Sequence, residues 1–372
     1  MPSFQTKGET MEGNLIFFTT QWFTIQPDLF GRIEDEVGEL GESEKEFVRI
    51  CTTALNSGRF EKYRWCGNGH PPSSRVAIFK MLVLKALRNF PTTKDTLLII
   101  RQSPVLRRLC GWESVADVPS ESTVSRAYDQ FAQDEIASLV HADFVQAALG
   151  RNGVFHVSHD SSAIDAREKG QRKPQTEEEK AETALGAQRN RTADENFALL
   201  PQHCDWGCKR DSKGKRKMWR GYKLHVSCAD GDIPLAAFLS SANLHDSKAI
   251  IPMMQKVSEN FDYFYDLADA GYDAAEIRQA SVGMQHVPII DRNPRRGEKN
   301  VDDKGGRTVG IIDATTRRYF VRSGIERVFS HLHEAHGGKF VRVRGNRKVF
   351  LHLMFGLIVV TAEQIFSTVA LA

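Results

Sequence analysis

The stretch "YFVRSGIERVFSHLHE" (319–334) combines an amphipathic helical pattern with polar side chains that could do chemistry. Residues three, four and seven apart share one face of a helix, and that face here carries Tyr319, Arg322, Glu326 and His333. A solvated Arg322–Glu326 ion pair, stabilising by about 0.3–0.5 kcal/mol, would explain the pattern by itself. A chemical role for Glu326 therefore depends on other acidic residues that could reach it.

Two more carboxylates close predicted strands. Asp160 follows the alternating stretch "NGVFHVSH", and Asp269 ends "YFYDLAD", just before a turn at Gly271. In an open α/β sheet, functional groups gather at strand ends and in the loops that follow them. Three carboxylates meeting there would repel one another unless cations bound among them, and oxygen ligands suit Mg²⁺ or Mn²⁺ better than zinc. The residues thus predict a site for hard metal ions.

A pair of such ions would allow in-line attack on a phosphodiester. One ion makes a hydroxide-like nucleophile from water or a sugar hydroxyl, and the other stabilises the leaving oxygen. Each aspartate also has a purely structural interpretation. Asp160 could start a turn with Ser161 and Ser162, and Asp269 could do the same beside Gly271.

The elements that must position these acids divide into a helical first part and an α/β second part. Residues 71–150 are mostly helical in pattern, and Ser120 is a candidate N-cap. The period changes to two at about residue 152. Beyond it we expect a hairpin over 221–242 around an Asp-Gly turn, strands at 262–271 and 286–290, and helices at 245–257 and 273–281. Asp246 is expected to cap the first of these helices, and Asp273 with Glu276 to form a capping box on the second.

This order predicts an α/β fold with a mixed sheet. We expect a mainly helical N-terminal domain over 1–150, a candidate for DNA binding or dimerisation, and a catalytic domain over 151–372. A polar, highly charged insertion at about 166–219 interrupts the second domain. It is expected to hold a helix and a mobile basic loop.

The composition is that of an ordinary soluble globular protein. The chain has 372 residues, of which 41% are hydrophobic and 26% charged, so it is not a disordered polymer. The net charge of +3 is too small to indicate a polyanionic partner without knowing how the charge is distributed. The longest apolar run, from Phe350, is interrupted by His352 and is short for a membrane span, which favours a buried helix. No secretory signal is visible, so a cytosolic protein with six reduced cysteines is expected.

Four blocks in fixed order carry a family resemblance: "HDSSAID", "GYKLHVSCADGDIPLAAFLSSANLHDS", "LADAGYDAAEI" and the spaced residues Tyr319, Arg322 and Glu326. Between about 150 and 366 the chain resembles the DDE transposases of bacterial insertion sequences, specifically the insertion-sequence-four/five group. In that family the helix carries Tyr, Arg, Glu and Lys at these spacings, and here His333 replaces the lysine. The stretch 71–132 resembles the helical region that precedes such catalytic domains.

The resemblance implies an RNase H-like core. It also implies that Asp160, Asp269 and Glu326 bind Mg²⁺ or Mn²⁺, as two ions, and that Tyr319 and Arg322 contact DNA near the scissile phosphate. His333 is the candidate for the fourth contact on that helix, although imidazole is shorter than lysine and only partly charged near pH 7.

Three basic segments, 209–223, 292–300 and 339–348, could position DNA through its phosphates, or could be solvated loops. Their candidate contacts are Lys215, Arg216, Lys217, Arg220, Arg295, Arg296, Arg342 and Arg344. Cys204 and Cys208 lack the two further ligands that a structural zinc site needs, so zinc is not expected there.

The sequence thus predicts a DNA transposase that binds transposon ends, frees a 3′-hydroxyl and transfers it to target DNA. One alternative is a domesticated or decayed descendant that binds DNA without cutting it. Another is an RNase H-like nuclease without strand transfer. By analogy the active complex is expected to be a homodimer associated with the bacterial nucleoid, without a membrane partner.

Overall fold

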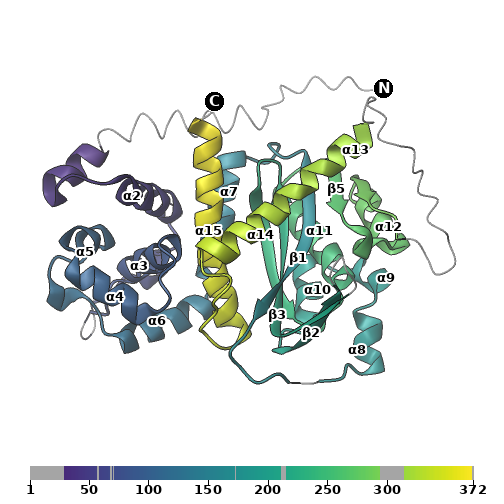
Figure 1. Cartoon of the computed structure of the whole chain (residues 1–372), viewed down its shortest axis with the longest axis horizontal. Helices are drawn as coiled ribbons and strands as arrows, with labels where there is room; N and C mark the ends of the chain where they lie inside the picture. Colours follow the sequence, from purple (N-terminus) through teal and green to yellow (C-terminus); the bar gives the residue numbers. More distant parts are fainter. Residues whose placement is uncertain are drawn as a thin grey trace.

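A six-stranded mixed sheet forms the centre of the second part of the chain in the computed structural model (Figure 1). The structure describes residues 29–370 apart from 57, 68, 70, 172, 211–214 and 294–313. The strands are β1 (His156–Asp165), β2 (Asp205–Arg210), β3 (Arg216–Ala229), β4 (Ile233–Ser241), β5 (Tyr265–Ala268) and β6 (Val287–Ile290).

The pairing of these strands gives an RNase H-like topology. The strand β1 lies antiparallel to β3 and parallel to β5, which in turn pairs in parallel with β6. The strands β2 and β4 pair with successive halves of β3. The predicted β3–β4 hairpin is present, but its two positive-φ residues are Gly231 and Asp232, one position later than the predicted Asp-Gly turn at 230–231. The predicted fold class, a mixed α/β sheet preceded by a helical region, is confirmed.

The first part of the chain is helical. It contains α2 (Glu42–Leu55), α3 (Arg75–Leu87), α4 (Thr93–Gln102), α5 (Pro104–Cys110), α6 (Glu121–Gln133) and α7 (Ile136–Leu149). Ser120 caps α6 by accepting from the backbone N–H of Thr123, as its position predicted. The break between α7 and β1 lies where the hydrophobic period changes. The division into two domains at 150 stays a prediction, since one continuous hydrophobic core includes residues from both sides.

The C-terminal helix α15 (Asn346–Ala370) joins the two parts. It packs against α3, α6 and α7 and against β4, and in Figure 1 it stands between the helical region and the sheet. The helix extends beyond the apolar run that predicted it, so the argument that the element is too short for a membrane span was wrong. Its segment Asn346–Ser367 is long and apolar enough to cross a membrane, yet 72% of its most apolar window is buried inside the protein. It is a core helix, as predicted.

Helices cover both faces of the sheet. Phe238 of β4 packs on one face with Ala249 and Met253 of α11 (Ser247–Asn260), and α12 (Ala275–Gly283) packs against β6. The next residue, Leu239, belongs to the core on the other face, which α14 (Ser323–Ala335) and α15 share. Figure 1 shows α14 crossing the sheet. This arrangement brings α14 over β1 and β3.

The charged insertion is more ordered than the sequence predicted. It contains α8 (Glu177–Glu182), α9 (Leu185–Gln188) and α10 (Ala193–Leu199), and its basic end forms β2 and the start of β3 instead of a loop. Gly207 pairs with Trp219, and a Cβ on Gly207 would lie 2.3 Å from the Trp219 ring. The buried indole of Trp219 therefore packs on Gly207 and stabilises the pairing of β2 with β3. The many lysines and arginines around these two residues had suggested a loop instead of strands.

Candidate active site

Asp160 and Asp269 lie side by side at one edge of the sheet. Ser158 of β1 is in register with Leu267 of β5, and the parallel pairing continued by two residues places the two aspartates together. Burial raises the pKa of Asp160 to about 6, with a further contribution from the negative charge of Asp269. Asp269 follows the end of β5 as expected, but the prediction that Asp160 closes its strand was wrong: β1 continues to Asp165 because it stays paired with β3, so Asp160 lies within the strand and starts no turn.

A buried carboxylate fixes the strand that carries Asp269. Asp266 on β5 is fully buried and receives hydrogen bonds from Ser281 at 2.6 Å, His159 at 3.0 Å and His286 at 3.1 Å. Burial alone would raise the pKa of Asp266, but hydrogen bonds from the two histidines and their charge hold it well below its usual range. Since His159 belongs to β1, this network locks the two strands in register.

Both aspartates also take part in local backbone hydrogen bonds. Oδ1 of Asp269 accepts from the N–H of Gly271 at 2.8 Å, and Oδ1 of Asp160 accepts from the N–H of Ser161 at 2.7 Å. The turn that the structural interpretation predicted is therefore present at Asp269. In each case the bond engages one carboxylate oxygen, so it orients the side chain and leaves the second oxygen for another ligand.

Arg322 connects the third acid to the first. Its Nη2 donates to Oε1 of Glu326 at 2.8 Å, and its Nη1 lies 3.6 Å from Oδ2 of Asp160. The Glu326 side chain is 61% exposed and can reorient. Within the described ranges, only one group of three His, Cys, Asp or Glu side chains has its ligand atoms within 4.8 Å of one another, and it lies elsewhere. Arg322 thus joins Asp160 and Glu326, Asp269 neighbours Asp160, and the three acids do not form a closed ligand set.

Tyr319 completes this polar face. It ends α13 (Ala314–Tyr319), and its hydroxyl donates to Oδ2 of Asp291 at 2.5 Å. The guanidinium of Arg322 stacks over its ring, 5.6 Å from the centroid. The short 3-10 helix η4 (Phe320–Arg322) joins α13 to α14. The single helix predicted over 319–334 is therefore divided among the end of α13, η4 and α14.

Two contacts fix α14 against the sheet. Arg327 donates to both oxygens of Asp232 in the β3–β4 turn, at 2.6 and 2.7 Å. Nε2 of His333 lies 2.8 Å from Oγ of Ser162 on β1. Burial lowers the pKa of His333 and outweighs the opposing effect of its hydrogen bond with the backbone of Gly338. The imidazole is therefore neutral at pH 7. This position of α14 therefore carries no permanent positive charge.

Sequence reasoning missed Asp291 and Tyr272. Asp291 directly follows β6, so the rule that selected Asp160 and Asp269, an acid at the end of a strand, would have found it. The buried Tyr272 follows Asp269 in the short helix η3 (Ala270–Tyr272), and burial and the nearby charges of Asp246, Asp160 and Asp269 raise its pKa well above the usual value. No spacing pattern points to it.

Two predicted caps are wrong. Asp246 is at the N-cap position of α11, but its side chain makes no cap and instead pairs with Lys223 at 2.9 Å. Helix α12 begins after Ala274, without a side-chain cap. Asp273 pairs with Arg278 at 2.8 Å instead of forming a capping box. Asp246 pairs with a lysine distant in sequence, and Asp273 pairs with an arginine five residues later. Capping patterns in the sequence do not reveal either ion pair.

The predicted DNA contacts fall in three places. Exposed residues on and before β3 include Lys215, Arg216, Lys217 and Arg220. Arg342 and Arg344 are exposed in the segment between α14 and α15, and Arg295 and Arg296 lie outside the described residues. Cys204 is buried and Cys208 exposed, and in the described part of the chain neither joins a group of three metal ligands.

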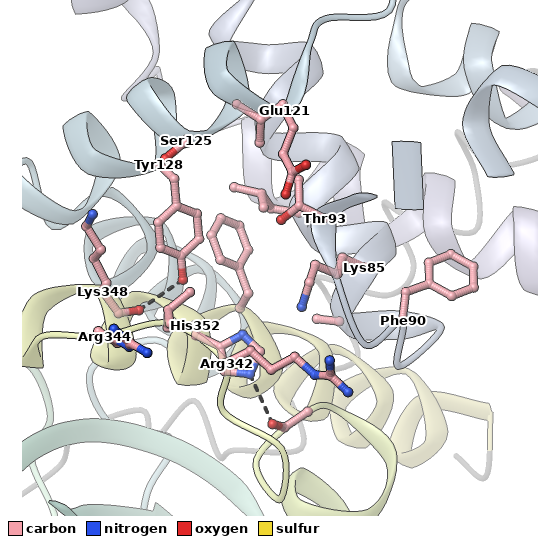
Figure 2. Close-up of a pocket in the computed structure, with 16 residues that line it drawn as sticks. Lys85, Phe90, Thr93, Glu121, Ser125, Tyr128, Arg342, Arg344, Lys348 and His352 are labelled. Atoms are coloured by element: carbon pink, nitrogen blue, oxygen red, sulfur yellow. Dashed lines mark hydrogen bonds between the residues drawn. The ribbon is translucent and has the colours of Figure 1, made fainter. Parts of the chain in front are cut away.

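A basic cavity of about 460 Å³ lies between the helical region and the segment that carries the two arginines (Figure 2). Lys85 of α3 faces it together with Arg342, Arg344 and His352. Burial and the positive charge of Arg342 lower the pKa of Lys85 to about 8. Burial lowers the pKa of His352 to about 4, so it is neutral, but Lys85, Arg342, Arg344 and Lys348 outnumber the one carboxylate of the lining, Glu121, which favours an anionic ligand.

Comparison with known proteins gives two family matches. Residues 156–361 match the family described as Transposase DDE domain, and residues 38–130 match Transposase domain (DUF772). A search of curated proteins finds no match. Among solved structures, a cryo-EM structure of a piggyBac transposase synaptic complex with hairpin DNA is 10% identical, with 88% of this chain and 74% of that chain covered. Its TM-score of 0.40 is too low to carry an argument.

The first match contains every element of the sheet and all three candidate acids, and it covers more than half of the chain. The second covers most of the helical region up to α6. The chain therefore belongs to the DDE transposase family.

Proposed function

We propose that this protein is a transposase of the insertion-sequence-four/five group that binds transposon ends, hydrolyses a phosphodiester to free a 3′-hydroxyl and joins that end to target DNA. The observation that supports the proposal is that Arg322 contacts both Asp160 and Glu326, while Asp269 neighbours Asp160 across β1 and β5 of an RNase H-like sheet.

The same three acids are the proposed metal ligands. All their donor atoms are carboxylate oxygens, which suits Mg²⁺ or Mn²⁺, and the pKa of Asp160 is raised mainly by burial and further by the charge of Asp269, both of which a bound cation would offset. Two ions bound there would supply an activated hydroxyl nucleophile and stabilise the leaving oxygen.

The neighbouring side chains have distinct proposed roles. Arg322 holds Asp160 and Glu326 in the absence of cations and is released to bind a phosphate oxygen of DNA. Tyr319 donates a hydrogen bond to Asp291, and its ring positions the guanidinium of Arg322 by stacking. His333 contacts Ser162 of β1. Its imidazole accepts a proton only when a phosphate approaches, because burial lowers its pKa.

In this proposal bound DNA contacts the three basic segments of the chain. Backbone phosphates contact Lys215, Arg216, Lys217, Arg220, Arg295, Arg296, Arg342 and Arg344. The cavity beside Lys85 and Arg342 offers a pocket for one such phosphate. In this proposal the active form is a homodimer acting on the nucleoid in the cytoplasm.

The test uses a supercoiled plasmid that carries the inverted repeats flanking the gene. With Mg²⁺ the wild-type protein should nick at the repeat ends and join them to target DNA. Asp160→Asn, Asp269→Asn and Glu326→Gln should bind the ends but not nick them. The matched control is Asp262→Asn, which alters an exposed carboxylate of the same region that pairs with Arg151.

The departure from lysine at position 333 favours one second candidate, a descendant that binds ends without cutting. Wild-type protein that retains tight end binding but never nicks would establish that candidate and refute the first. Nicked ends without joined products would instead indicate a nuclease that lacks strand transfer.

A further inference from the structure

A cluster of three candidate metal ligands lies at the C-terminal end of α14. His331 belongs to α14, His336 is its C-cap residue and Glu363 comes from α15. Their ligand atoms all lie within 4.8 Å of one another, and no other group of three in the described ranges meets that criterion. The proposed role in DNA cleavage does not use these residues.

The spacing of the ligand atoms is close to that of a coordination shell. Oε2 of Glu363 lies 3.0 Å from Nε2 of His336 and 3.4 Å from Nε2 of His331. A tetrahedral ion with bonds of about 2.0–2.1 Å holds its ligands about 3.3 Å apart. Small side-chain adjustments would therefore place the three atoms around one ion.

The hydrogen bond behind His336 defines which nitrogen is available. Nδ1 lies 3.2 Å from the carbonyl oxygen of Ala86, which can only accept, so Nδ1 carries the proton. Nε2 of the neutral ring then presents a lone pair to the carboxylate of Glu363, and two acceptors at 3.0 Å require a cation between them. A proton could serve that pair, but the second imidazole directed at the same oxygen favours a metal ion.

We propose that His331, His336 and Glu363 bind one Zn²⁺ ion, with a water molecule in the fourth position. Imidazole nitrogen together with carboxylate suits zinc, whereas Mg²⁺ prefers oxygen alone. A backbone carbonyl that orients a ligating imidazole, as Ala86 orients His336, is the usual outer support of such sites. His336 is 3% exposed, so this ligand is already held in place.

The ion would fasten the proposed catalytic helix to its surroundings. Glu326 and His331 both lie on α14, Glu363 lies on the core helix α15, and Ala86 lies on α3 of the helical region. The zinc site would thus hold the helix that carries the third acid against both parts of the chain. With three protein ligands and one water it keeps an open position, unlike a closed four-ligand site, and it differs from the proposed Mg²⁺ site in its ligand chemistry.

The experiment measures zinc directly and needs neither DNA nor cleavage, so its failure is distinct from failure of the proposed function. Full-length protein is stripped with a chelator, dialysed against Zn²⁺ and then against buffer, and its metal content is determined by inductively coupled plasma mass spectrometry. Wild type should retain one more zinc per chain than His331→Gln or Glu363→Gln. Those variants change side chains that are 39% and 20% exposed, so both should fold.

His203→Gln, a partly buried histidine outside the cluster, is the matched control and should retain zinc like wild type. Zn²⁺ should also raise the melting temperature of wild type and of the control, but not that of the two cluster variants, and Mg²⁺ should not replace it. Equal zinc content in wild type and both cluster variants would overturn the proposal and leave a proton-bridged network.

Discussion

Nη1 of Arg322 lies 3.6 Å from Oδ2 of Asp160, across the contact between η4 and β1. The same guanidinium donates to Glu326, so one fixed positive charge sits among the acids of the candidate active site. Both side chains of the Arg322–Asp160 pair are less than one-fifth exposed, so solvent screens their interaction only in part. The arginine therefore stabilises the carboxylates in the metal-free protein and competes with cations for them.

Replacing Arg322 with alanine should separate these two effects. Without metal, Arg322→Ala should be less stable than wild type by about 1 kcal/mol, because Asp160 loses its cationic partner. Added Mg²⁺ should raise its melting temperature more than that of wild type, because the competing charge is gone. Arg322→Lys should behave like wild type toward Mg²⁺, since it keeps the charge. Thermal unfolding with and without Mg²⁺ measures both, and a smaller Mg²⁺ response in Arg322→Ala would contradict the account.

Asp160 should cost the metal-free protein stability above pH 4. Its pKa of about 6 in the folded state exceeds its ordinary value of 3.8, so the folded protein binds this proton more tightly than the unfolded chain. Stability is thus lost as the pH rises from about 4 to about 6. Asp160→Asn should remove a penalty of at most about 3 kcal/mol at pH 7 and give no gain at pH 4.

Chemical denaturation in the presence of a chelator at both pH values measures this difference. Asp262→Asn, which changes an exposed carboxylate, serves as the control and should be neutral at either pH. An Asp160→Asn protein that is no more stable than wild type at pH 7 would show that the carboxyl group is not under electrostatic strain.

His333→Lys should increase DNA affinity in a pH-dependent way. The neutral imidazole of His333 gains charge only on protonation, whereas lysine is charged throughout. At pH 8 the variant should bind transposon ends more tightly than wild type, with one additional phosphate contact that steepens the salt dependence by about 0.9. The advantage should shrink toward pH 5. Equal affinities at pH 8, measured by fluorescence anisotropy, would place His333 outside the DNA contact surface.

Arg342 should contribute one phosphate contact through the cavity shown in Figure 2. Arg342→Ala should therefore weaken binding of any DNA sequence and reduce the slope of log K against log salt by about 0.9. Arg32→Ala changes the net charge equally at an exposed position near the start of the described chain and should leave the slope unchanged. Identical slopes for the two variants would remove this cavity from the DNA path.

The sequence predicted five of the six strands, all but β2, because period-two alternation and an Asp-Gly turn are local signals. It correctly placed Asp269 at the end of a strand, but it ended the first strand at Asp160, whereas β1 continues to Asp165 and the two acids are neighbours through the parallel pairing of β1 with β5. Pattern analysis did not predict the β2–β3 pairing, because its stabilising residues, Gly207 and Trp219, are isolated among exposed charges. Only their register in three dimensions reveals the contact.

The partners of the site residues were less predictable. The Arg322–Glu326 pair follows from helical spacing, but the contact of Arg322 with Asp160 joins elements far apart in sequence. The contact of His333 with Ser162 also joins elements far apart in sequence. Burial of His333 in this contact lowers the pKa of its imidazole, which is therefore neutral at pH 7. Sequence spacing identifies which residues share an element, whereas charge state depends on packing between elements.

The central claim, that Asp160, Asp269 and Glu326 bind the catalytic metal ions, is tested most directly by changing one ligand atom from oxygen to sulfur. A thiolate is a softer ligand that accepts Mn²⁺ better than Mg²⁺. Asp269→Cys should fail to nick transposon ends with Mg²⁺ and regain nicking with Mn²⁺, whereas Asp262→Cys should nick with either ion. Nicking by Asp269→Cys at the wild-type rate in Mg²⁺ would contradict the account, because Asp269 would then not be a metal ligand.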